Sequence, residues 1–120
     1  MEKTTKYRSI VKRGLTEFAQ WVNGGQLLSA DGKTDAEETI CVFDDERDQY
    51  MVVSVTWGQF KCVRSTPLFV RIRNGKIWIE EDWTKDGFAT DLLEAGVPNE
   101  DIVLGFQPPE MRIYTEFAVA

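Results

Sequence analysis

The 120-residue sequence contains no histidine, and this absence removes several kinds of chemistry at once. Histidine is the usual general base near neutral pH, the common partner of serine or cysteine in nucleophilic dyads, and a frequent zinc ligand. Catalysis would have to use carboxylates, Lys, Tyr or an unassisted Cys. The composition therefore favours a non-enzymatic protein with no catalytic residue, metal or other cofactor.

Cysteine and long apolar runs are also scarce. Cys41 and Cys62 lie in separate apolar segments without a C-x-x-C spacing, so we expect two small buried side chains in a reducing compartment. No apolar run approaches the roughly 20 residues that span a bilayer. The opening MEKTTKYRSIVKRG lacks the apolar centre of a secretory signal. We expect a cytoplasmic protein without a membrane partner.

The net charge of −6 is unevenly distributed along the chain. Residues 30–50 carry eight acidic and two basic side chains, and residues 80–101 carry eight acidic and one basic. Residues 51–79 carry five basic side chains and no acidic one. Because proteins that bind DNA by neutralising phosphates carry dense basic stripes, two acidic blocks favour a basic protein partner over DNA.

The hydrophobic periodicity predicts one α+β domain over residues 1–120, with an N-terminal helix, a four-stranded antiparallel sheet, a second helix and a docked apolar tail. The first helix covers about 3–22 and ends at Asn23-Gly24-Gly25. The polar segment that follows contains a turn at ADGK, and Gly58 with Gln59 forms a later reversal. Strands are expected at 39–44, 50–57 and 60–73, and from 76 onward. Pro67 should mark a bulge or an edge position.

The C-terminal part contains clear helix and turn signals. Thr84 is the expected N-cap of the second helix, Phe88, Ala89, Leu92 and Leu93 face inward, and Gly96 ends it. Residues 99–106 form a short turn or 3₁₀ piece that leads into an extended segment. Trp21, Trp57 and Trp83 are expected in the core or at its edge.

Asn74-Gly75 predicts a two-residue type I′ hairpin, which fixes the register of the flanking strands. Ile72 then faces Ile77, Arg71 faces Trp78, and Phe69 faces Glu80. One strand face mixes basic, aromatic and acidic side chains, and we take it as the candidate partner-binding surface. It consists of Arg71, Arg73, Lys76, Trp78, Glu80 and Asp82. A cross-strand pair on a wet or covered face, a nucleic-acid contact and a protein interface all remain open readings.

Acidic residues cluster at the end of this hairpin. Glu80 and Asp82 share a strand face while Glu81 points the other way, and Asp86 falls in the first turn of the expected helix. Three carboxylates therefore do not converge, and we interpret them as solvated ends and caps. DDERD at 44–48 lacks the ligand spacing of a calcium loop and is expected to be a turn.

Several segments, taken in order, resemble one protein family. They are YRSIVKRGLTEFAQ, DQYMVVSVTW, IRNGKIWIEED, LLEAGVPNEDIVLGF and PPEMRIYTEFAVA. Together they are similar to the fdxN element excision-controlling factor family, the XisI-like proteins, over nearly the whole chain. One departure is Gln107, where family members often carry a histidine.

The resemblance implies a small α+β protein that acts with a companion factor, XisH-like, in the excision of a DNA element by a recombinase during heterocyst development. It carries no catalytic motif. With the charge map, it predicts an accessory factor whose acidic segments near 35–48 and 80–101 engage a basic companion. The alternative is a DNA-binding directionality factor that uses Arg64, Arg71, Arg73 and Lys76. A homodimer is possible in either case, and a carboxylate-dependent hydrolase or nuclease is the least favoured class.

Overall fold

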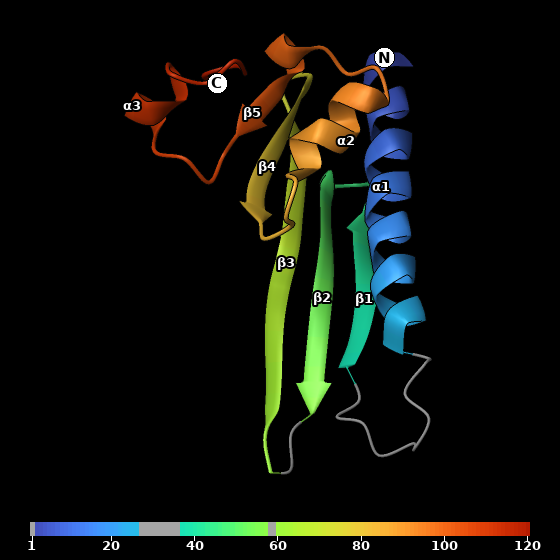
Figure 1. The fold of residues 1–120 in the computed structure, drawn as a ribbon. Coiled ribbons are helices and arrows are strands. Elements are labelled where there is room, and N and C mark those ends of the chain that lie inside the picture. The colour runs from blue at the N-terminus through green and yellow to red at the C-terminus, as the bar shows by residue number, and fades with distance from the viewer. Residues whose placement is uncertain (1, 27–36, 58–59) are drawn as a thin grey trace.

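One long helix and a second short helix cover the same face of a curved five-stranded sheet (Figure 1). The computed structural model describes residues 2–26, 37–57 and 60–120. The ADGK turn and the reversal at Gly58-Gln59 lie outside these described residues. The core lies between the helices and the covered sheet face, and its fully buried members include Val11, Leu15, Tyr50, Val52, Leu68, Val70, Ile77 and Leu92.

Helix α1 spans Glu2–Gln26 and packs on the sheet through a stripe of residues four positions apart. Tyr7, Val11, Leu15 and Ala19 are buried, as a helix with one apolar stripe requires. The prediction that α1 ends at Asn23-Gly24-Gly25 is wrong, because the helix continues to Gln26. Asn23 instead donates from Nδ2 to the carbonyl of Thr39 (3.0 Å), and its Oδ1 accepts from the Thr39 amide (3.1 Å).

The strands occur in the sheet in the order of the sequence. Strands β1 (Glu37–Asp44), β2 (Gln49–Trp57), β3 (Cys62–Arg73) and β4 (Lys76–Asp82) pair antiparallel, as predicted. The prediction of four strands is one short, because β5 (Ile102–Leu104) pairs with β4 in parallel. Three apolar residues are too short a run to distinguish a strand from a turn in the sequence.

Two β-bulges shift the register between paired strands of the sheet. Thr66 and Pro67 on β3 together oppose the single residue Val53 on β2, so Pro67 marks a bulge on an inner strand. Glu80 is the extra residue on β4, and Phe69 therefore faces Glu81 instead of the predicted Glu80. The turn itself is confirmed, with φ values of 53° and 74° at its two central residues, Asn74 and Gly75.

Helix α2 spans Phe88–Glu94 and begins four residues after the predicted N-cap. The prediction for Thr84 is wrong because Gly87 is the N-cap residue, and the first amide of the helix, that of Phe88, donates to Asp82 Oδ2 (2.6 Å). Asp82 Oδ1 accepts from both the amide and the hydroxyl of Thr84 (2.9 and 2.6 Å). Asp86 therefore precedes the helix. The end at Gly96 is confirmed by a Schellman pair of bonds, in which the amides of Gly96 and Val97 donate to carbonyls of α2.

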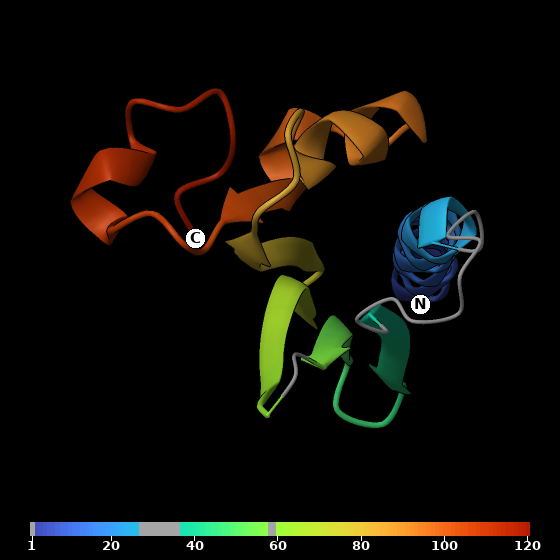
Figure 2. The same cartoon turned by 60° about the horizontal axis from the view of Figure 1, so that its bottom comes forward.

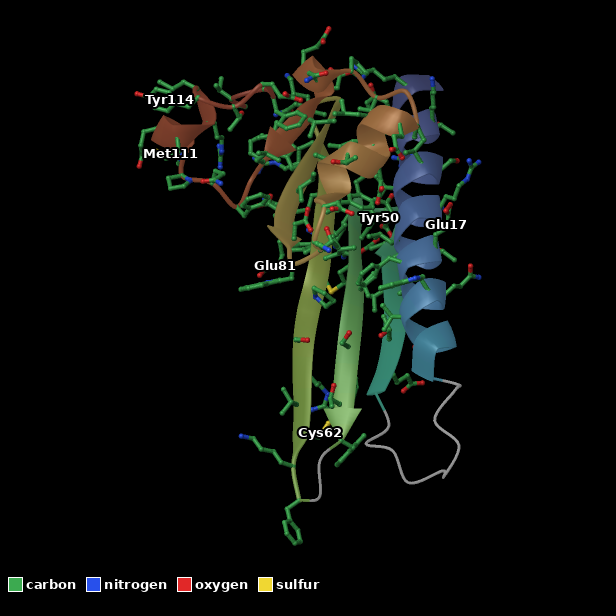
Figure 3. The ribbon with its side chains drawn as sticks, in the orientation of Figure 1. Glu17, Tyr50, Cys62, Glu81, Met111 and Tyr114 are labelled. Atoms are coloured by element: carbon green, nitrogen blue, oxygen red, sulfur yellow. The ribbon has the colours of Figure 1, made fainter. Side chains whose placement is uncertain are left out.

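The C-terminal segment passes through the 3₁₀ turn η1 (Asn99–Asp101) and β5, and then forms a loop with the short helix α3 (Pro109–Arg112). The predicted docking is seen at its end, where the Ala118 amide donates to the Ile102 carbonyl (2.8 Å) and Phe117 packs on the core. Met111 and Tyr114 project from the loop and remain exposed (Figure 3).

Candidate functional site

The predicted partner-binding residues lie together, but their side chains contact one another and the rest of the chain. Arg71 donates from Nε and Nη2 to Glu80 Oε2 at 2.9 and 2.7 Å, and both side chains are at most a third exposed. Asp82 caps α2. Arg71, Glu80 and Asp82 therefore hold the end of the hairpin and offer little free polar surface.

Trp78 is covered by the C-terminal loop. Only 9% of it is exposed, and the guanidinium groups of Arg73 and Arg112 lie 4.8 and 5.4 Å from its ring centre. Arg112 also donates to the carbonyls of Gly105, Gln107 and Val119, which fixes the loop over the indole. Of the proposed DNA-binding set, Arg71 is paired and Arg73 is stacked, whereas Arg64 is exposed and Lys76 half-buried. The basic residues thus form no continuous free stripe.

The carboxylates at the end of β4 point to three different partners. Glu80 binds Arg71, Glu81 accepts from the indole of Trp83, and Asp82 binds the backbone of α2. Among the residues that the structure describes, no group of three His, Cys, Asp or Glu side chains is placed to hold a metal ion. No described helix is long and apolar enough to cross a membrane.

Two carboxylates of the first acidic block pair with basic side chains of α1. Asp48 accepts from Arg8 at 2.6 and 3.2 Å, and Asp45 pairs with Lys12 at 3.0 Å. The hydrogen bond from Arg8 lowers the pKa of Asp48, and that from Lys12 lowers the pKa of Asp45. The hydroxyl of Tyr50 donates to both carboxylates, which ties the β1–β2 turn to the helix. This turn is confirmed, and three of its four carboxylates, those of Asp44, Asp45 and Asp48, already have basic partners.

A groove with a volume of about 790 Å³ lies between α1 and α2. Its floor forms where the two helices approach closely: a Cβ on Gly14 would lie 2.9 Å from the ring of Phe88. One wall is the outer side of α1 and the other is the segment 83–87 with α2. We call this the α1–α2 groove, and its lining includes Arg13, Glu17, Phe18, Trp21, Trp83, Lys85, Asp86, Asp91 and Glu94.

Two tryptophans stand at the α1–α2 groove with most of their surface in solvent. Trp21 is 76% exposed and Trp83 is 77% exposed, so the prediction that they belong to the core or its edge is wrong. Trp57 is 54% exposed, so the same prediction is wrong for this residue too. Trp83 additionally borders a second hollow of about 420 Å³ beside the Pro67 bulge. Exposed tryptophans beside a hollow are typical of protein interfaces, because a large rigid ring gains much from burial.

The groove carries four carboxylates, one from α1 and three from the second acidic block. Glu17, Asp86, Asp91 and Glu94 line it, and none has an ion-pair partner among the described residues. Partial burial raises the pKa of the Asp91 carboxyl, and repulsion from Glu94, Asp82, Glu17 and Asp86 raises it further. Two bases, Arg13 and Lys85, are also present. The four carboxylates outnumber them, and the surface has a net negative charge.

This arrangement suits recognition better than reaction. The lining combines exposed aromatic rings with carboxylates, the kind of surface that binds a partner with basic and apolar side chains. The sequence did contain a signal for the α1 wall, since Arg13, Glu17 and Trp21 recur every four residues and must share a helix face. The sequence did not indicate that residues 83–95 form the other wall of the groove, because their position depends on where α2 begins.

Known proteins resemble the chain along almost its whole length. The family model described as XisI protein matches residues 1–119. A crystal structure of the fdxN element excision controlling factor XisI from Anabaena variabilis is 36% identical, with a TM-score of 0.79. A XisI-like protein from the same organism is 33% identical, with a TM-score of 0.82. Each comparison covers 98% of this chain and 99% of the other. No curated protein matches the chain.

Proposed function

This chain belongs to the XisI protein family, and we propose that it is a regulatory, non-enzymatic factor in the excision of a DNA element of the fdxN type. It acts by binding a protein partner in the α1–α2 groove. The partner is the companion excision factor that the family resemblance implies, and it contributes a basic segment with apolar side chains.

The observation that carries this proposal is the pairing of exposed aromatic surface with unneutralised negative charge in one groove. Trp21 and Trp83 offer apolar area, while Glu17, Asp91 and Glu94 offer carboxylates without basic partners. A segment with Lys or Arg beside apolar residues would satisfy both, because charge complementarity steers association and buried aromatic rings supply affinity. The acidic turn at 44–48 is less suited, since Asp45 and Asp48 already pair with α1 and Asp44 pairs with Arg47.

Direct DNA binding finds less support in the geometry. The phosphate backbone requires free, closely spaced Lys and Arg side chains. Arg71 and Arg73 have intramolecular partners, and the carboxylates of the groove would repel phosphates. We therefore favour the protein partner over the DNA-binding alternative.

Co-purification of this protein with the companion factor, expressed from the same host, tests the proposal. The charge-reversed double variant Asp91→Lys with Glu94→Lys should lose the complex, and wild type should lose it gradually as salt rises, because exposed ionic contacts are screened. Glu46→Lys is the matched control. Glu46 is exposed in the β1–β2 turn and its side chain has no ion-pair partner among the described residues, so this reversal should leave the complex intact.

Circular dichroism of each variant separates lost binding from lost folding. The proposal would be contradicted if the companion binds the double variant as well as wild type, or if it does not bind folded wild type at all. Gel shifts with the recombination-site DNA distinguish the alternative, since salt-sensitive DNA binding that survives the groove substitutions would assign the function to the basic side chains instead.

A further inference from the structure

The face of the sheet opposite the helices carries an apolar patch across β1, β2 and β3. Side chains alternate between the two faces of a strand, and Tyr50, Val52 and Leu68 on the helix side are completely buried. The opposite positions form two rows in the observed register. We call these residues the outer patch: Val42, Met51 and Phe69 in one row, and Ile40 and Val53 in the next.

The described elements leave the outer patch open. Helices α1 and α2 lie on the other face, and the C-terminal loop lies against β4 and β5, where Arg112 stacks on Trp78 (Figure 2). Ile40 is 40% exposed and Val42 is 47% exposed. When both faces of a strand are rich in Val, Ile, Met and Phe, the sheet is normally covered on both sides. The outer patch therefore needs a cover.

The charges beside the outer patch indicate what covers it. Glu38 on β1 and Arg64 on β3 both pair in register with Val55 on β2, so they occupy the same face on either side of one apolar residue. Both are exposed and neither has an ion-pair partner among the described residues. The patch is thus flanked by a negative side chain on β1 and a positive one on β3.

A two-fold axis parallel to β2 would make this face complementary to itself. Rotation about that axis places β1 of one copy over β3 of the other while keeping each row at the same height. Glu38 then faces Arg64 of the second copy, twice, and Met51 and Val53 of β2 each face the same residue of the second copy across the axis. A two-fold interface needs such self-complementarity, and two sheets pack face to face with their strands nearly aligned.

We infer that the chain forms a symmetric homodimer through the outer patch of β1, β2 and β3. The occupant is a second copy of this chain, held by apolar contact between the two sheets and by paired Glu38–Arg64 contacts at the rim. The α1–α2 groove lies on the helix side, so dimerisation leaves it accessible. This inference is independent of what binds the groove.

Sedimentation velocity of the full chain over a concentration series tests the inference. At high concentration, the sedimentation of wild type should correspond to a species of twice the 13.7 kDa chain mass. Glu38→Arg and Arg64→Glu, each alone, should raise the dissociation constant at least about tenfold, because each places like charges opposite one another. The double variant Glu38→Arg with Arg64→Glu should restore the wild-type constant, since the swapped charges again face their opposites.

Circular dichroism of each single variant shows that it folds, so that a weaker dimer reports on the interface alone. Val53→Lys supplies a second test, because a charge at the centre of the outer patch should leave a folded monomer. The inference is overturned if wild type stays monomeric throughout, if neither single variant weakens the dimer, or if the double variant is no better than the singles. It is equally overturned if Val53→Lys remains dimeric.

Discussion

At the scale of single residues, similar carboxylates have opposite effects on the fold. Asp101 is buried, which alone would raise its pKa, but hydrogen bonds from Tyr7 (2.5 Å) and Lys3 (3.0 Å) outweigh this and lower the pKa. Its ionised form stabilises the folded chain. Asp91 has no such donors, and its pKa is raised. The groove therefore keeps negative charge at some expense of stability, as functional surfaces often do.

This difference predicts the effect of Asp91→Asn. A raised folded pKa means that the native state binds the Asp91 proton more tightly than the unfolded state, so wild type loses stability as the pH rises above about 4. Asp91→Asn should therefore raise the melting temperature slightly at pH 7, and this gain should vanish near pH 3. The effect is small because the side chain is exposed and screened.

Thermal unfolding at the two pH values measures this difference, with Glu46→Gln as the control for removing a negative charge outside the groove. A lower melting temperature for Asp91→Asn at pH 7 would show that the carboxylate stabilises the fold. That result would contradict the interpretation that the Asp91 carboxylate serves binding at the expense of stability. The same variant should bind the companion factor more weakly than wild type does.

The tryptophans show where prediction from sequence fails at this scale. Trp78 was placed on a mixed face, correctly, yet the structure buries it under the C-terminal loop. Trp21, Trp57 and Trp83 were expected in the core or at its edge and are exposed. Residue type gives the average burial of tryptophan, whereas its actual burial depends on segments that are distant in the sequence.

At the scale of elements, the beginning of α2 positions one wall of the groove. Asp82 ends β4 and accepts three hydrogen bonds from the segment that begins the helix. Figure 3 shows the neighbouring Glu81 near the end of β4. The strand and the helix are therefore coupled through a single carboxylate, and that segment includes Trp83, Lys85 and Asp86 of the groove.

Asp82→Ala should destabilise the fold by about 1–2 kcal/mol, because it leaves the Phe88 amide at the start of α2 without its acceptor. Thr84→Val removes one hydroxyl donor and should cost less than about 1 kcal/mol. Urea denaturation compares the two variants. A larger loss for Thr84→Val would return the N-cap to Thr84 and contradict the observed start of the helix.

Local sequence signals account for most of the elements and some of their ends. The Asn-Gly turn, Pro67 and Gly96 were read correctly because each acts through its own backbone. The features that were missed include the parallel β5, the extension of α1 to Gln26 and the bulge at Glu80. Each depends on a partner elsewhere in the chain, such as β4 for β5, Thr39 for Asn23 and Arg71 for Glu80.

At the scale of the whole molecule, the sequence anticipated the acidic character of the candidate site but not its position. The acidic block at 80–101 contains paired and unpaired carboxylates that the sequence cannot separate. The fold pairs Glu80, Asp82 and Asp101 with partners and leaves Asp86, Asp91 and Glu94 around the groove. A homodimer through the outer patch would present two such grooves, and two linked sites raise the effective affinity for a paired partner.

The four tryptophans report on separate surfaces in a single experiment. Trp21 and Trp83 line the α1–α2 groove, Trp57 lies at the end of β2 on the outer face of the sheet, and Trp78 is buried under the C-terminal loop. Indole N–H signals of the ¹⁵N-labelled protein, followed by NMR during titration with the companion factor, therefore locate the binding surface. The proposed docking predicts that the Trp21 and Trp83 signals move, while those of Trp57 and Trp78 keep their positions. Movement of the Trp57 or Trp78 signal with Trp21 and Trp83 unchanged would contradict it.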